Sequence, residues 1–173
     1  MSTPRIRLVG FVVTALAAAL DVALASCDPV HSDAVDALGG EVAGVRTGPL
    51  HRPGQPCLQC HDGKVGDPGE FSVAGTIFQN ETDLTPAVGV SVTLTSANGA
   101  AYTLTTNAAG NFYVTPTEFT PAYPMGALVT SGATIVRMST LIGRDGSCAG
   151  CHHDPVGPSS PGHVFIPADG GTP

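Results

Sequence analysis

The chain has 173 residues, enough for one domain with a hydrophobic core but too few for two large ones. It contains 7 Lys or Arg against 14 Asp or Glu, and this acidic balance leaves no basic patch for binding nucleic acid. Trp is absent, and 22 Gly with 15 Pro favour short strands and turns over long helices.

The first 26 residues have the pattern of a secretory signal peptide. Arg5 and Arg7 form a positive region, and an uncharged apolar run over Leu8–Leu20 follows. This run is too short for a membrane-spanning helix. Small residues then lead to Cys27. Removal of residues 1–26 takes away two Arg and one Asp, so the net charge changes from −7 to −8.

Two cleavage sites compete in this segment. Leu24-Ala25-Ser26-Cys27 resembles a bacterial lipobox, in which Cys27 receives a lipid and becomes the first residue of the mature protein. Ala23-Leu24-Ala25 also fits an ordinary signal-peptidase site, and Asp21 is unusual so late in an apolar run. We expect the lipobox to be used. The mature protein would then be a lipoprotein in the cell envelope of a Gram-negative bacterium, located in the periplasm, at the outer membrane or on the extracellular face of that membrane.

Residues 27–50 show no regular apolar period and are rich in small residues, Asp and Gly. This composition predicts a flexible tether that lifts the domain off a membrane, with one short helix around Ser32–Leu38. We interpret His31 as a residue of this tether.

From Phe71 onward the apolar residues alternate with polar or small ones, which predicts a β-domain over residues 71–140. Asn98-Gly99 is a strong hairpin signal because both residues tolerate positive φ. The fold class that follows is mainly β, an antiparallel β-sandwich of six to seven strands. Residues 156–173 are expected to form a loosely ordered tail. The six strands that we predict are Phe71–Ile77, Val88–Thr95, Ala101–Thr106, Asn111–Thr115, Met125–Ser131 and Thr134–Thr140.

Three stretches of this domain resemble the carboxypeptidase-regulatory-like, or transthyretin-like, β-sandwich. They are Val73–Ile77, Val88–Leu94 and Thr106–Phe112. The resemblance covers about 70 residues of the chain. It implies a scaffold and no activity, because such modules occur in many unrelated proteins.

Two C-x-x-C-H motifs flank the predicted sandwich, one in segment 51–70 and one in segment 141–155. Two Cys at this spacing can both form thioethers to one porphyrin, and the adjoining His can bind its iron as the proximal ligand. The motifs therefore predict two haem-binding loops and two haem c groups. Covalent attachment is expected at Cys57, Cys60, Cys148 and Cys151, and proximal iron binding at His61 and His152.

Three other uses of these cysteines stay open. Four Cys could form one structural zinc site, although such a site does not require a His after each pair. Two disulfides would suit an oxidising compartment, but loops of two residues are strained. A thioredoxin-like redox pair lacks its βαβ context here. Haem attachment accounts for all five Cys of the chain, with Cys27 lipidated.

Several side chains are candidates for the distal iron ligands. His51 precedes His61 by ten residues and His163 follows His152 by eleven, spans that can wrap around a haem. His153 cannot reach the distal face of its own haem. Its C-x-x-C-H-H context resembles motifs of compact multihaem cytochromes, which implies binding to a neighbouring haem. A fourth candidate is Met138, whose alternative is core packing.

The order of signal, motif, sandwich and motif resembles a family of small bacterial dihaem c-type cytochromes. The resemblance implies an electron carrier without catalytic residues. Its partners would be other redox proteins, such as cytochromes or proteins with basic surfaces, and a membrane through the lipid anchor. A haem-bearing gas sensor or a peroxidase-like enzyme is the alternative, and Arg52 or Arg144 could assist the latter. Since six strands return a chain to its starting edge, we expect both haems at one end of the sandwich, close enough to exchange electrons.

Overall fold

The chain divides into two compact units, residues 1–37 and residues 38–173. The expected signal segment 1–26 and the lipidation site Cys27 lie outside the residues that the structure describes. The computed structural model describes residues 29–41, 43–44, 46–64 and 69–167.

The described part of the first unit is the helix α2 (Pro29–Ala37), which contains His31. A helix was expected around Ser32–Leu38, and the observed one begins and ends earlier in the chain. Among the helices that the structure describes, none has both the length and the apolar character needed to cross a membrane.

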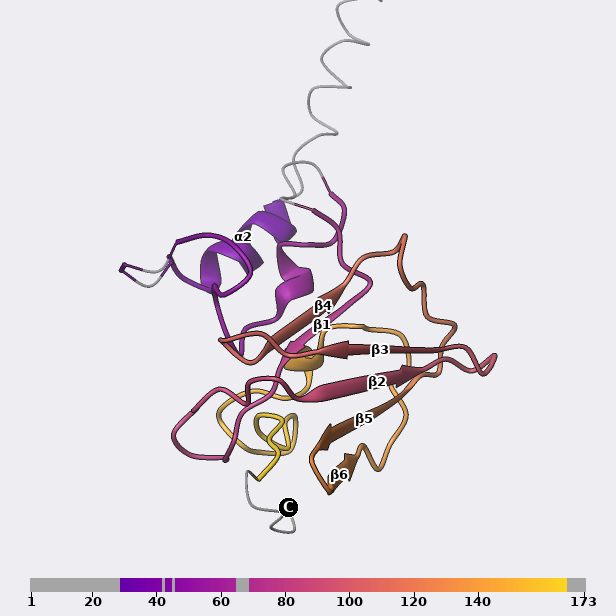
Figure 1. Cartoon of the computed structure of the whole chain (residues 1–173). Helices are drawn as coiled ribbons and strands as arrows, with labels where there is room; N and C mark the ends of the chain where they lie inside the picture. The colour runs from indigo at the N-terminus through magenta and orange to yellow at the C-terminus, as the bar shows by residue number, and fades with distance from the viewer. Residues whose placement is uncertain (1–28, 42, 45, 65–68, 168–173) are drawn as a thin grey trace, which may run out of the picture. The chain divides into compact units, whose positions relative to one another are not determined.

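The second unit is mainly β (Figure 1), as the alternating pattern predicts. Its described strands lie at the six predicted places, each somewhat shorter than predicted. They form two antiparallel sheets: β1 pairs with β4, and the larger sheet has the order β3-β2-β5-β6. The strands are β1 (Val73–Thr76), β2 (Ser91–Thr95), β3 (Ala101–Thr105), β4 (Asn111–Val114), β5 (Gly126–Ser131) and β6 (Thr134–Arg137).

The alternation along β2 determines which of its side chains enter the core. Val92 and Leu94 are buried, whereas Thr95 is exposed. The β2–β3 hairpin turns at the expected place, where Gly99 has a φ of 84° and donates its N–H to the carbonyl of Ser96. β2 lies inside the larger sheet, where it pairs with β3 on one edge and with β5 on the other.

Residues 38–50 belong to the second compact unit, so the predicted tether 27–50 is too long. Arg52 binds both the Glu41 carboxylate (Nε–Oε1 2.9 Å) and the carbonyl of Gly39 (2.7 Å). The Pro49 carbonyl accepts a hydrogen bond from the Asn107 amide at 2.6 Å. This stretch is held by contacts distant in sequence, which its unpatterned composition does not reveal.

The described part of the predicted loose tail, 156–167, is also packed. Ile166 is fully buried in the hydrophobic core. Its N–H donates to the carbonyl of Phe78, and the Phe78 N–H donates to the carbonyl of Val164, both at 2.9 Å. The expectation of a loosely ordered tail is therefore wrong for these residues, because the chain end supplies an apolar side chain that the core buries.

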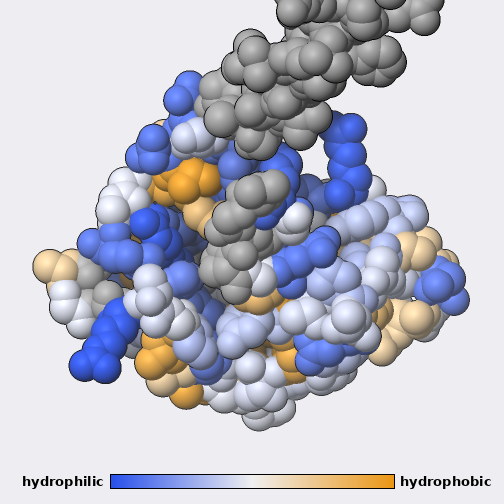
Figure 2. Space-filling model, turned by 90° about the horizontal axis from the view of Figure 1, so that it is seen from above, coloured by the Kyte–Doolittle hydropathy of each residue, from blue (hydrophilic) through white to orange (hydrophobic). Residues whose placement is uncertain are grey.

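The face in Figure 2 is mainly hydrophilic, with small separated hydrophobic patches. Most of the large apolar side chains of the second unit instead fill the core between the strands. Its largest fully buried apolar members are Phe78, Ile77, Leu94, Met125, Ile166, Val73, Val92 and Val114.

Candidate functional site

Both C-x-x-C-H motifs fold into the same tight turn. Each begins with a short 3₁₀ helix, η1 (Cys57–Gln59) in the first motif and η2 (Cys148–Gly150) in the second. The N–H of His61 donates to the carbonyl of Cys57 at 3.0 Å, and the N–H of His152 donates to that of Cys148 at 2.8 Å. In each motif this bond closes one turn, which brings the first Cys and the His together.

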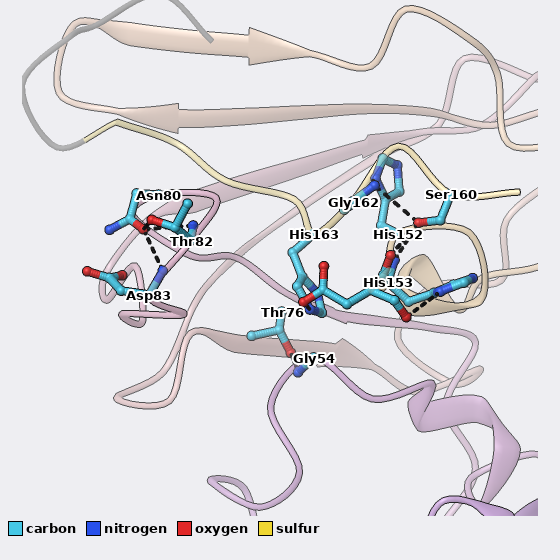
Figure 3. A network of polar contacts seen from close by, with 11 residues as sticks. Gly54, Thr76, Asn80, Thr82, Asp83, His152, His153, Ser160, Gly162 and His163 are labelled. Carbon is cyan, nitrogen blue, oxygen red and sulfur yellow. Dashed lines mark hydrogen bonds and ion pairs between the residues drawn. The ribbon is translucent and has the colours of Figure 1, made fainter. Parts of the chain in front are cut away.

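The two motif histidines are also held alike. The Nδ1 of His61 lies 2.6 Å from the carbonyl oxygen of Gly69, and the Nδ1 of His152 lies 3.0 Å from that of Gly162 (Figure 3). A carbonyl oxygen only accepts hydrogen bonds, so the proton of each neutral ring is on Nδ1 and the lone pair on Nε2. Metal-binding histidines usually have this arrangement, with the second ring nitrogen held by a carbonyl or carboxylate.

A cavity of about 520 Å³ with largely apolar walls opens beside the first motif. Its volume lies in the range of cofactor and ligand sites. The ring of Phe71 stacks on His61 with centroids 4.1 Å apart, and Tyr113 stacks on Phe71 at 4.6 Å. The lining includes Cys57, Cys60, His61, His51, Phe71 and Tyr113. The residues present thus fit a flat apolar cofactor attached through the two Cys.

His51 is the distal candidate that the structure brings to a proximal histidine. The ring centroids of His51 and His61 are 6.0 Å apart, with 51° between the ring planes. Two imidazoles that share one metal ion, each through a bond of about 2 Å, have centroids roughly 6 Å apart. The two rings are therefore spaced widely enough for one metal ion to lie between them.

The other distal candidates have different surroundings. The Nε2 of His163 lies 3.3 Å from Asp154 Oδ2, and its ring meets the edge of Phe78 at 5.1 Å. His153 donates its N–H to Ser160 Oγ at 2.8 Å (Figure 3). Met138 follows β6 at the edge of the larger sheet. None of these contacts involves a proximal histidine, so the roles of these three residues stay predictions.

The arginines considered for peroxidase-like chemistry are placed differently from each other. Arg52 lines the cavity, but its guanidinium binds Glu41, Gln55 and the Gly39 carbonyl. Arg144 is exposed.

Both motifs pack against β1, although they are far apart in sequence. The N–H of Ala74 donates to the carbonyl of Gly146 at 3.0 Å, which fixes the second motif beside the strand (Figure 1). On the side of the first motif, the N–H of Gly54 donates to Thr76 Oγ1 at 2.8 Å. A Cβ on Gly54 would lie 3.2 Å from a ring carbon of His163, so the first motif's segment also touches the stretch of chain that follows the second motif.

The first cysteine of each motif has a raised thiol pKa. Burial raises the pKa of Cys57 to about 11 and that of Cys148 to about 12. A charge on Cys57 would raise the pKa of Cys148 further. Redox-active C-x-x-C pairs instead have a thiol of lowered pKa, so these thiols differ from a thioredoxin-like pair.

The geometry also bears on the zinc and disulfide alternatives. Within the described ranges, no group of three or more His, Cys, Asp or Glu side chains is arranged to hold a metal ion. The four motif cysteines are not joined in disulfides. Cys151 is exposed, and the other three are partly buried. Neither alternative gains support from this arrangement.

Sequence reasoning missed the aromatic stack and the polar residues that hold the segment around His51. Phe71 and Tyr113 were interpreted only as strand residues, although aromatics make up 5% of the chain and two of them meet at one motif. Thr76 and Asn111 carried no signal, because their partners become neighbours only in the folded chain.

Comparison with known proteins identifies no relative of this chain. No protein-family model matches the chain, and neither the curated proteins nor the solved structures contain a match.

Proposed function

We propose that this protein is a dihaem c-type cytochrome that carries single electrons in the cell envelope. The observation that carries the proposal is the shared geometry of the motifs. Each places a C-x-x-C-H sequence on the same turn, with Nδ1 of the histidine held by a backbone carbonyl. The β-domain then serves as the scaffold that joins two haem-binding segments, arranged as a transthyretin-like sandwich.

Attachment would use the cysteine thiols and the vinyl groups of haem. Each S–H adds across one vinyl double bond: the sulfur forms a C–S bond, and the hydrogen goes to the other vinyl carbon, so no group leaves. Cys57 and Cys60 would hold one haem, and Cys148 and Cys151 the other.

When bound, haem would supply one-electron exchange between ferric and ferrous iron, with donor and acceptor redox proteins as partners. The chain's own residues set the conditions for this exchange. His61 and His152 would bind iron through Nε2, and the carbonyls of Gly69 and Gly162 fix their rings. Phe71 restricts the orientation of the His61 ring by stacking on it. The acidic net charge favours partners with basic surfaces.

The proposal includes an envelope location with lipid at Cys27. It rests on the signal-like N-terminus and the lipobox pattern. A gas sensor or a peroxidase would need an open iron site, and no contact in the described residues favours either over a carrier.

The proposal is tested on mature protein made in a host that assembles c-type cytochromes. Two haems per chain should stay attached after denaturation and acid–acetone extraction. Cys57→Ala and Cys148→Ala should each weaken attachment at one motif, so that extractable haem appears. Cys27→Ala is the control and should remove the acyl mass while leaving two attached haems. Fully extractable haem in the unmodified protein, or stoichiometric zinc in its place, would show that the proposal is wrong.

A further inference from the structure

We infer that His51 is the distal iron ligand of the first haem, and that Thr76 and Asn111 form a polar latch that positions it. This inference rests on the proposed function and adds a specific ligand pair to it. Its consequence is that the first haem is six-coordinate and closed to small molecules, so this site is a carrier site.

The ring geometry is the first argument. His51 lies 6.0 Å from His61 between ring centroids, and both rings line the cavity beside the first motif. The Nδ1 of His51 lies 3.6 Å from Glu41 Oε1, and the N–H of Gly48 donates to the same nitrogen at 3.4 Å. These contacts engage Nδ1, so Nε2 is the ring nitrogen that would bind iron.

The polar latch links the two strands of the smaller sheet to the backbone of His51. Thr76 on β1 and Asn111 on β4 are direct cross-strand partners and are both buried. The Thr76 hydroxyl donates to Asn111 Oδ1 at 2.7 Å, and the Asn111 amide donates to the carbonyl of His51 at 2.9 Å. Thr76 Oγ1 also accepts from the N–H of Gly54 at 2.8 Å (Figure 3). The sheet therefore holds the segment at His51 itself and again three residues later, at Gly54.

The backbone of Arg52, the residue after His51, adopts a strained conformation. Its φ of 48° lies in the left-handed region, which costs a non-glycine residue about 1 kcal/mol or more. The guanidinium compensates by binding Glu41, Gln55 and the Gly39 carbonyl. Strained residues persist where the surroundings over-determine them, and they concentrate at functional sites. Here the strain and the latch act on the same short segment.

A merely structural role of this segment would predict different behaviour. The latch would then stabilise the fold, and its loss would not alter the iron. If the latch positions His51, its loss should change the coordination of one haem while both haems stay attached. The spin state of the iron separates these two roles.

The test uses the holoprotein with both haems attached and compares each variant with the unmodified protein. In His51→Ala we expect one additional haem per chain to become high-spin and to bind carbon monoxide when reduced. Added imidazole should return that haem to the low-spin state. Asn111→Ala and Thr76→Val should produce the same change in a fraction of molecules, because the ligand is then present but loosely held.

Thr93→Val is the matched control. Like Thr76, Thr93 is a strand residue whose hydroxyl lies within hydrogen-bond distance of its cross-strand partner, Thr103 at 3.0 Å, but this pair belongs to the larger sheet. It should leave the spectrum unchanged. If His51→Ala keeps the unmodified spectrum, His51 is not the ligand. If only His51→Ala changes and both latch variants match Thr93→Val, the latch is wrong. Absence of attached haem in the unmodified protein would instead contradict the proposed function.

Discussion

Gly75 of β1 shows how single residues shape the second motif. A Cβ at this position would lie 2.8 Å from Cys148 Cβ and 2.9 Å from Phe112 Cζ. Contacts this short do not occur between real carbon atoms without displacement. The strand therefore lacks a side chain where Cys148 packs against it, and this position determines how closely the second motif approaches the sheet.

Gly75→Ala should destabilise the protein by about 1–3 kcal/mol, the usual cost of overpacking a filled core. The added methyl group should push Cys148 outward and so lower the yield of haem attached at the second motif. Denaturant unfolding measures the first effect, and mass spectrometry of the mature chain measures the second. Gly143→Ala is the control, because a Cβ there has no atom within 4 Å. Equal stability of the two variants would contradict this account.

At the scale of elements, the β3–β4 turn sets the register of the smaller sheet. Gly110 has a φ of 74°, and its carbonyl accepts the N–H of Ile77 at 2.9 Å. A Cβ on Gly110 would clash with the Ile77 carbonyl oxygen. This close approach aligns Thr76 with Asn111, the pair that holds the segment of His51.

Gly110→Ala should lower the free energy of unfolding more than Gly99→Ala does. Both positions have positive φ, so both variants carry backbone strain of roughly 1 kcal/mol. Only Gly110 adds a clash with backbone, since Gly99 has no atom within 4 Å of its Cβ position. We expect an additional loss of about 1–3 kcal/mol for the overpacked turn. Denaturant titrations of both variants measure this difference. Equal decreases in the free energy of unfolding would mean that the β3–β4 turn accommodates the added methyl group without strain.

At the scale of the whole second unit, β1 is the meeting point of the two haem-binding segments. Gly54 and Cys148 contact this strand from the two segments. The electrostatic influence of Cys57 on Cys148 agrees with this proximity. A protein with two such neighbouring haems would pass an electron between them within one chain.

We therefore predict that the two haems interact. The holoprotein should show magnetic coupling between the irons in electron paramagnetic resonance, or split exciton bands in Soret circular dichroism. A variant with Cys148→Ala and Cys151→Ala should hold one haem and lose both signals. Two magnetically isolated haems in the unmodified protein would instead indicate that the β-domain acts as a spacer.

The sequence by itself was sufficient for the features that depend on local pattern. Period-two alternation identified the places of all six described strands, and the Asn98-Gly99 pair identified a hairpin. These features follow from neighbouring residues alone, because strand faces and turn conformations are set within a few positions. The C-x-x-C-H pattern likewise lies within five residues, and both copies take the same local turn.

The tertiary structure decided which distant residues meet. It brought the ring of His51 beside that of His61, and it placed residues 38–50 and Ile166 in the folded unit. From the sequence, the first of these segments was expected to be a flexible tether and the second a loosely ordered tail, because neither has a periodic apolar pattern. Their order comes from hydrogen bonds to Asn107 and Asn111 and from burial against the core. Such contacts join residues about sixty positions apart, and no local pattern records them.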